Sequence, residues 1–253
     1  MKKIISFCVY GPHSLYNDGA YKNIAEAKEY FPDWICRFYV ANDCPILSKL
    51  LESQYNKECE VVIKDPEDGI KGMFWRLEAI SDPEASHIII RDTDQRLSDK
   101  DAQTVQKWIE SGAIAHRMHE ECGQAGLVLM GCAWGIKGGI IKDINKRIED
   151  WINQNAGYTI GAKYTGDTHS RKNILGHEKP KLYYGADQIF LEEVVWTEIS
   201  NNCKTFGILG EAFPSHKALK WGGDSMFRRI KPFIECKEIF GERPQYAYDL
   251  EIK

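Results

Sequence analysis

The chain has 253 residues, 43% of them hydrophobic, enough to bury the core of one large α/β domain or two small ones. Thirty-three basic and 37 acidic residues leave a formal charge of −4 with no long run of one sign, which speaks against a nucleic-acid-binding surface. The eight cysteines form no Cys-x-x-Cys pair and several stand in apolar runs. Their pattern favours buried thiols in a reducing compartment over disulfides or structural zinc.

The first residues, MKKIISFCVYGPH, imitate a signal peptide with two lysines and an apolar run. The run ends at Gly11, however, and no cleavage-like site follows it. Nowhere does the chain contain the run of about 18 apolar residues that a membrane-spanning helix needs. We therefore expect a cytoplasmic protein whose first apolar run is a strand.

Strand-like and helix-like patterns alternate through the N-terminal part of the chain. The strands are predicted at residues 3–10, 35–40, 59–64 and 87–92, and the helices between them at 20–31, 46–54 and 72–80. Such alternation predicts right-handed crossovers and a mostly parallel sheet. Ligands of such sheets bind beyond the carboxyl ends of the strands.

The next helix has clear boundary signals. Ser98 can cap its first turn, where the negative charges of Asp99 and Asp101 interact favourably with the helix macrodipole. Gly112 ends the helix. A strand is expected at 113–118, followed by the apolar, glycine-punctuated stretch GLVLMGCAWGIKGG and by helices at 140–153 and 187–199. Residues 155–184 show little apolar periodicity, which favours a mobile lid over the site. Without repeats or linkers, a single domain with a variable C-terminal half is the simplest organisation.

The strand containing Ile88, Ile89 and Ile90 ends on two carboxylates, Asp92 and Asp94, at the sheet edge where a ligand is expected. Two carboxylates so close repel each other unless water or a cation surrounds them. Oxygen ligands suit Mg²⁺ or Mn²⁺, which keeps other positions for water and substrate phosphates and can stabilise a departing diphosphate. The alternative is a solvated turn without a ligand.

The segment RDTDQRLSDKDAQTVQKWIESG, preceded by GMFWRLEA and followed by AHRMH and GCAWGIKGG, resembles DxD-containing glycosyltransferases of the GT-A (nucleotide-diphospho-sugar transferase) fold. It is most similar to a polysaccharide-type group with a DTDSRL-like motif and a later GGMWG segment. The likeness runs from about Lys3 to Gly139. Gln95 departs from the serine of that motif, and His116 and His119 stand in a loop that reads MRDHP in the group.

The resemblance implies an α/β, GT-A-like fold with a Rossmann-type, mostly parallel central sheet flanked by helices. It implies a nucleotide-binding half at 1–97 and a donor-sugar and acceptor half at 98–253, within a single domain. It also implies Mn²⁺ or Mg²⁺ on Asp92 and Asp94. The expected activity is hexosyltransferase-type transfer from a nucleotide-diphosphate sugar to a glycan or other hydroxyl acceptor.

Farther on, GADQIFL resembles the Asp–Gln segment of retaining GT-A enzymes of the glycogenin type. By that likeness Asp187 and Gln188 are catalytic candidates that face the donor sugar, and transfer with retention is favoured. His216, in FPSHKALKWG, is then the candidate for a third metal ligand. The alternatives are a helix N-cap for Asp187 and an ordinary surface histidine for His216.

Five further residues are candidates for contacts with the nucleotide sugar, each with a structural alternative. Arg76 could reach a phosphate or brace Asp92, or form a surface ion pair. Tyr10 could meet the base or pack in the core. Asp65 could accept a hydrogen bond from the ribose or base, or simply begin a turn. Trp134 and Gly135 could form a floor under the donor sugar, although a buried core tryptophan is the common case.

Two rival functions remain at this point. A haloacid-dehalogenase-like phosphohydrolase also ends a strand on DxD, but normally near the chain start, whereas three predicted strands precede the motif here. The other rival is a transferase-like module that binds a nucleotide sugar without turnover. The expected partners are the donor and a glycan or hydroxyl acceptor, without nucleic acid, and the sequence leaves the oligomeric state open.

Overall fold

The computed structural model describes residues 1–66, 71–119, 128–156, 158–160, 171–173, 181–183 and 185–207. His216 lies outside these residues, and most of the segment expected to form a lid does too. No helix within the described ranges is long and apolar enough to cross a membrane.

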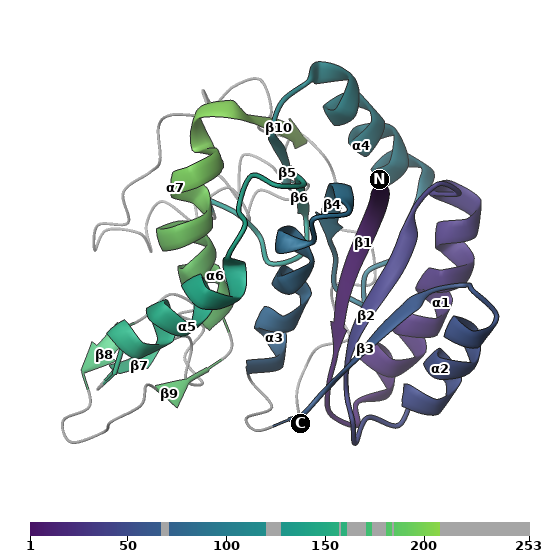
Figure 1. Ribbon diagram of the computed structural model, residues 1–253, viewed down its shortest axis with the longest axis horizontal. Coiled ribbons are helices and arrows are strands. Elements are labelled where there is room, and N and C mark those ends of the chain that lie inside the picture. The colour runs from purple at the N-terminus through teal and green to yellow at the C-terminus, as the bar shows by residue number, and fades with distance from the viewer. Residues whose placement is uncertain are drawn as a thin grey trace, which may run out of the picture.

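A seven-stranded sheet with the order β10-β5-β6-β4-β1-β2-β3 forms the centre of the molecule (Figure 1). Its strands are β1 (Lys2–Val9), β2 (Ile35–Ala41), β3 (Glu60–Lys64), β4 (Ala85–Ile90), β5 (Ala115–His119), β6 (Trp134–Lys137) and β10 (Cys203–Gly207). All neighbouring pairs are parallel except the two that involve β6, which runs antiparallel to both β4 and β5. The prediction of a Rossmann-type, mostly parallel sheet is confirmed, and the arrangement is consistent with a GT-A-like fold.

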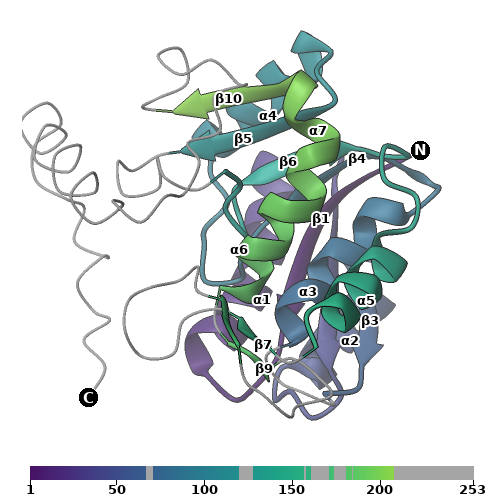
Figure 2. The ribbon, with the colours of Figure 1, turned by 90° about the vertical axis from the view of Figure 1, so that its left-hand side faces the viewer.

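Helices cover both faces of the sheet (Figures 1 and 2). On one side lie α1 (Ser14–Tyr30), α2 (Leu47–Tyr55) and α4 (Asp99–Ser111). On the other lie α3 (Gly72–Trp75) with the 3-10 helix η2 (Arg76–Ser81), α5 (Ile144–Gln154), and the run of α6 (Ala186–Phe190), the π-helical η4 (Leu191–Val195) and α7 (Trp196–Ile199). A short 3-10 helix, η5 (Ser200–Asn202), leads into β10, and β7 (Tyr158–Ile160), β8 (Arg171–Asn173) and β9 (Lys181–Leu182) form a small second sheet.

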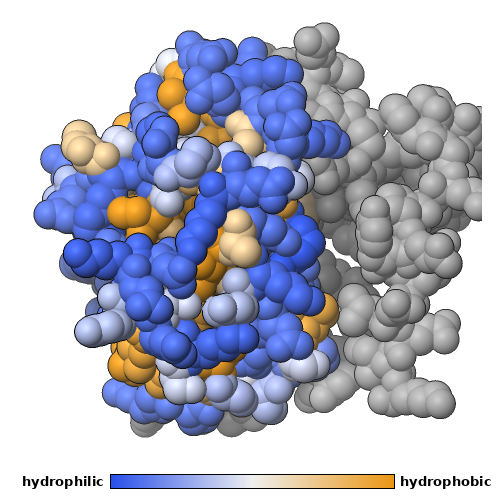
Figure 3. Space-filling model, turned by 90° about the vertical axis from the view of Figure 1, so that its right-hand side faces the viewer, coloured by the Kyte–Doolittle hydropathy of each residue, from blue (hydrophilic) through white to orange (hydrophobic). Residues whose placement is uncertain are grey.

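The central strands form because their residues are apolar on both faces, as two covered faces require. On β1, Ile4, Ile5 and Phe7 are fully buried, and Phe7 stacks on Phe38 of β2 at 5.0 Å between ring centroids. The outer surface over α1 and α2 is largely hydrophilic, with apolar side chains showing in a band between polar ones (Figure 3). The core therefore lies between the sheet and its two helical layers.

The boundaries of α4 follow the sequence signals. Ser98 Oγ accepts a hydrogen bond from the Asp101 N–H at 3.3 Å, and Gly112 ends the helix with φ 72°. By contrast, α1 begins at Ser14 and not at residue 20. His13 caps it, with Nδ1 accepting from the Leu15 N–H, and this use of histidine as a cap gives little signal in sequence.

Candidate active site

The aspartate pair lies directly beyond β4, at the carboxyl edge of the parallel strands. Asp92 is partly buried and Asp94 is exposed, and a turn begins at Asp92, whose carbonyl accepts from the Gln95 N–H at 3.2 Å. This is the location at which such sheets bind ligands. The structure therefore places both carboxylates where the sequence predicts them.

Helix α1 holds the backbone between the two aspartates. Asn23, fully buried in α1, donates from Nδ2 to the Thr93 carbonyl at 3.2 Å. Gly19 approaches the same carbonyl so closely that an added Cβ would lie 2.0 Å from its oxygen. One turn farther along α1, Glu26 accepts from the Leu97 N–H at 2.9 Å. The carboxylates thus project from a turn whose backbone is fixed.

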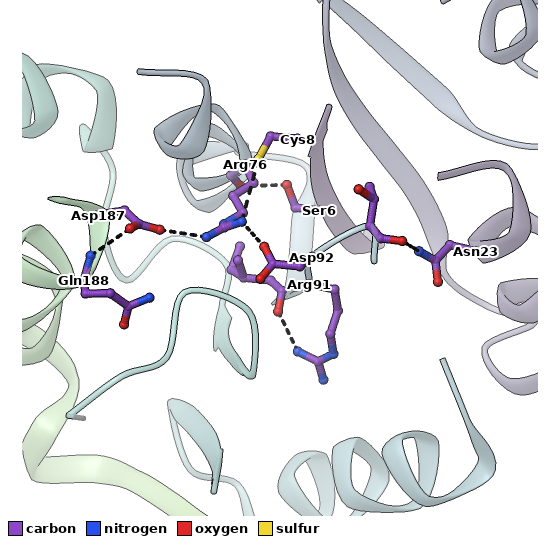
Figure 4. A network of polar contacts seen from close by, with 10 residues as sticks. Ser6, Cys8, Asn23, Arg76, Arg91, Asp92, Asp187 and Gln188 are labelled. Atoms are coloured by element: carbon purple, nitrogen blue, oxygen red, sulfur yellow. Dashed lines mark hydrogen bonds and ion pairs between the residues drawn. The ribbon is translucent and has the colours of Figure 1, made fainter. Parts of the chain in front are cut away.

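Arg76 joins Asp92 to Asp187, a residue that is distant in sequence (Figure 4). Its guanidinium is buried; Nη1 pairs with Asp92 Oδ1, and Nη2 pairs with Asp187 Oδ2 at 2.8 Å. Cys8 Sγ lies 3.7 Å from Nη1. The Nε atom is buried without a hydrogen-bond partner among the described residues. Both the expected bracing of Asp92 and the proximity of Asp187 to the motif are therefore present.

The charges of the cluster influence one another strongly. Burial raises the pKa of Asp187, and the Arg76 charge acts in the opposite direction. Although the Asp94 side chain is exposed, the protein around it desolvates the carboxylate, and this effect, with the Asp92 charge, raises its pKa. Burial also raises the pKa of Cys8 to about 11, so that thiol is neutral near pH 7. Cys8 therefore adds no charge beside Arg76.

Gln188 holds the backbone that leads from β5 into β6. With its amide oriented to satisfy both ends, Nε2 donates to the Leu129 carbonyl at 2.8 Å and Oε1 accepts from the Gly131 N–H at 2.7 Å. Gly131 is packed so tightly that a Cβ there would lie 2.5 Å from Arg76 Nη2 and 2.9 Å from Asp187 Oδ2. Gln188 therefore holds the loop by bonds to two of its backbone groups, while its side chain remains partly exposed.

The expected floor of Trp134 and Gly135 is wrong for this structure. The Trp134 side chain is 0% exposed, because β6 is an interior strand with β4 on one side and β5 on the other. A Cβ on Gly135 would lie 2.7 Å from the ring of His116 and 2.8 Å from the Ile88 carbonyl oxygen. The two residues belong to the core, and the glycine allows close packing of protein and not of a ligand.

The His116 side chain is also buried. It packs against Trp108, with ring centroids 4.4 Å apart, and neither ring nitrogen has a hydrogen-bond partner among the described residues. Burial lowers its pKa well below the usual value. The His119 backbone ends β5.

Tyr10 and Asp65 both follow strands that end at the same edge as β4. Tyr10 packs edge-on against Trp75 at 6.0 Å and lies so close to Gly72 that a Cβ there would be 2.4 Å from its ring. Asp65 accepts from Asn42 Nδ2 at 2.7 Å, which links the ends of β2 and β3. Both remain near the carboxyl edge, Tyr10 mainly as a packing residue.

The sequence reading missed Tyr16. In the first turns of α1 its ring is 39% exposed and lies edge-on to His13 at 5.5 Å. Burial raises the pKa of its hydroxyl, as do the nearby charges of Asp94 and Asp92. An aromatic surface therefore borders the carboxylates. Placing it required the true start of α1.

Within the described part of the chain, no group of three or more His, Cys, Asp or Glu side chains is arranged to hold a metal ion. The carboxylates of Asp92 and Asp94 nevertheless fit a hard divalent cation, since Mg²⁺ and Mn²⁺ accept two protein oxygens and fill the rest of their shell with water and phosphate. One oxygen of Asp92 is paired with Arg76. The second oxygen of Asp92 and the Asp94 carboxylate are the groups to consider as ligands.

No family model and no curated protein sequence matches the chain. Among solved structures, it is similar to S. aureus TarS 1–349 in complex with UDP, at 9% identity over 48% of this chain and 36% of that one, with a TM-score of 0.35. It is also similar to the mannosyltransferase PcManGT from Pyrobaculum calidifontis in complex with GDP-Man and Mn²⁺. That match has 10% identity over 62% of this chain and 48% of that one, with a TM-score of 0.41. This chain thus spans about a third and about half of these two proteins. Both TM-scores lie below 0.5.

Proposed function

We propose that the protein is a glycosyltransferase that moves a sugar from a nucleotide-diphosphate sugar to a glycan or other hydroxyl acceptor. The observation that carries the proposal is the joining of Asp92 to Asp187 through Arg76 at the carboxyl edge of the sheet. This contact brings the DxD turn and the Asp–Gln helix into one site. The resemblance noted in the sequence assigns these same two segments to the donor phosphates and the donor sugar.

A divalent cation, Mn²⁺ or Mg²⁺, belongs to this proposal. Asp92 and Asp94 would hold it, with His216 proposed as a further ligand. When bound, the ion would neutralise charge on the departing diphosphate. Retention of configuration is proposed on the likeness of the Asp187 segment alone.

The residues of the site have separable roles in this proposal. Asn23 and Gly19 fix the turn, so that Asp94 is presented at the surface without rearrangement. Arg76 orients the carboxylates of Asp92 and Asp187 by pairing with both. A preorganised arrangement of this kind lowers the cost of orienting charged groups when a donor binds. Residues 1–97 would bind the nucleotide and residues 98–253 the donor sugar and acceptor.

Asp65 is the residue that we propose for the nucleoside. Its carboxylate stands at the carboxyl edge with one oxygen accepting from Asn42, which leaves acceptor capacity on the other oxygen for a ribose or base. Tyr10 follows the end of β1, which is separated from β3 in the sheet by β2. Its ring would limit the depth to which a nucleoside can enter.

A donor panel tests the proposal. The full chain should release nucleoside diphosphate from one nucleotide sugar when Mn²⁺ is present, slowly to water and faster when an acceptor alcohol or glycan is supplied. Asp187→Asn should lose this release while retaining nucleoside diphosphate binding. Binding of a nucleotide sugar without any release would instead favour the non-catalytic module. Hydrolysis of a phosphate monoester, with no donor bound, would favour the phosphohydrolase.

A further inference from the structure

Strand β3 ends the central sheet, and no described strand pairs with its outer side. The direction of its backbone groups follows from two hydrogen bonds. The Lys64 carbonyl accepts from the Asn42 N–H at the end of β2, whereas the Val61 N–H is bonded by the Gln54 side chain and not by β2. Since these directions alternate along a strand, Val61 and Ile63 present their N–H and C=O groups outward.

The side chains on this edge are also incompletely covered. Ile63 is 52% exposed, and Tyr55, the last residue of α2, is 88% exposed. The bond from the Gln54 side chain to Val61 places the end of α2 beside the first half of β3. An uncovered apolar edge strand is a template for pairing with another strand.

The sequence of β3, EVVIK, is complementary to itself when reversed. In an antiparallel pair centred on Val62, Glu60 faces the partner's Lys64, and Val61 faces the partner's Ile63. The outward groups of Val61 and Ile63 then form hydrogen-bonded pairs, and the two copies of Val62 meet as the close pair without hydrogen bonds. The charges match in the same register as the backbone groups.

The same register covers the exposed apolar residues. Ile63 lies opposite the partner's Val61. Val61 is in the first half of β3, and the partner's α2 ends beside that half of the strand. The exposed Ile63 therefore comes next to the partner's Tyr55, and the reverse contact follows by symmetry. Opposite charges and apolar pairs across strands each add stability to such an interface.

We propose that the protein forms a two-fold symmetric dimer in which β3 pairs antiparallel with β3 of a second copy, with Val62 on the axis. The central sheet then continues across both subunits. Gln54 competes with this pairing, because its side chain bonds the Val61 N–H in the single chain. Glu60 keeps its contacts with Lys2 and Arg37 and gains the partner's Lys64 as a further neighbour. The inference is independent of the function proposed above.

Cross-linking tests the register. In Val62→Cys the two thiols would sit in a close pair with Cα atoms about 4.5 Å apart, within the range that a disulfide spans. In the matched variant Ile63→Cys the two cysteines are diagonal neighbours, with Cα atoms about 7–8 Å apart and beyond that range. Mild oxidation should convert Val62→Cys to a covalent dimer and leave Ile63→Cys and the unmodified chain monomeric on a non-reducing gel. Equal cross-linking of the two variants, or none in Val62→Cys, overturns the proposal.

Sedimentation tests the backbone pairing without new cysteines. Proline at position 63 removes only an outward N–H, which an edge strand tolerates, whereas threonine keeps that N–H. The unmodified chain and Ile63→Thr should sediment as dimers, and Ile63→Pro should associate at least about tenfold more weakly, since two intersubunit hydrogen bonds are lost. Gln54→Ala should tighten the dimer. A monomeric unmodified chain, or equal weakening by threonine and proline, contradicts the pairing.

Discussion

Arg76 is the residue on which the two parts of the candidate site depend. Its guanidinium is planar and has donors on both terminal nitrogens, so it can hold Asp92 with one and Asp187 with the other. A lysine has a single charged centre and would be expected to hold only one of them well. Because the guanidinium is buried, both of its carboxylate partners are needed. An unpaired charge in this position has little water to solvate it.

Arg76→Met should therefore lower the free energy of unfolding by about 3–5 kcal/mol, the usual cost of leaving buried carboxylates without their cation. Urea denaturation measures it. Adding Asp187→Asn to Arg76→Met should recover part of the loss, because one unpaired charge is then removed. Strict additivity of the two single changes would show that the ion pair does not couple these residues.

Gly131 is the second residue on which the geometry depends, because its Cα rests against the Arg76–Asp187 pair. Gly131→Ala would force a Cβ to within 2.5 Å of Arg76 Nη2, and the ion pair leaves that nitrogen little freedom to move. We expect a loss of about 1–3 kcal/mol in the free energy of unfolding, typical of overpacking. Chemical denaturation of the variant measures this loss. An unchanged stability would mean that the loop between β5 and β6 yields more easily than its contacts suggest.

At the scale of elements, α1 and β4 act together. Helix α1 holds the turn after β4 through Asn23 and Glu26, which lie one helical turn apart on the same face. The helix thus fixes the backbone that carries the two carboxylates, and Tyr16, nearer the start of the helix, lies beside them. The position of Asp94 therefore depends on the position of α1.

Asn23→Ala removes one of two side-chain hydrogen bonds to the Thr93 carbonyl, which also accepts from Arg96 Nη2. We expect it to lower the free energy of unfolding by about 0.5–1.5 kcal/mol, the net contribution of one hydrogen bond, because the Arg96 bond to the same oxygen remains. Asn42→Ala is the matched control, since Asn42 makes an exposed side-chain hydrogen bond at the same edge and should change stability by less than about 0.5 kcal/mol. Equal effects in thermal and urea denaturation would contradict the supporting role of α1.

The elements also show which parts of the site were predictable. The apolar run of β4 and the two aspartates after it give a local signal, and the structure places them as expected. The contact of Arg76 with Asp187 depends on tertiary packing between segments far apart in the chain, which no local pattern contains. Trp134 was misassigned because β6 runs antiparallel inside the sheet, and a short apolar strand does not reveal its direction or its neighbours.

On the scale of the whole molecule, one buried and one partly buried histidine make stability depend on pH. His116 is enclosed beneath the sheet with Trp108, and the nearby Arg91 charge adds to the effect of burial in lowering its pKa. The pKa of His87, whose ring also packs against Trp108, is lowered too, mainly by burial and then by Lys137. In the unfolded chain both rings titrate near the usual value of about 6.5.

Because the unfolded state binds these protons first, stability is retained above about pH 6.5 and lost as the pH falls below it. His116→Gln should reduce the slope of unfolding free energy against pH, between about pH 6.5 and 5, by up to about 1.4 kcal/mol per pH unit. Part of the slope should remain because of His87. Urea denaturation across this pH range measures it, and an unchanged slope would show that His116 accepts a proton in the folded state as readily as in the unfolded one.

The central claim is that Asp92 and Asp94 bind a divalent cation together with a nucleoside diphosphate. Calorimetric titration of UDP and of GDP, each with and without Mn²⁺, tests it most directly on the unmodified chain, on Asp94→Asn and on Asp99→Asn, a control with an exposed aspartate in the first turn of α4. We expect Mn²⁺ to strengthen binding of at least one nucleotide to the unmodified chain and to Asp99→Asn. We expect Asp94→Asn to fold normally and to lose this Mn²⁺ dependence. Equal Mn²⁺ dependence in Asp94→Asn and the unmodified chain would contradict the assignment of the cation to this pair.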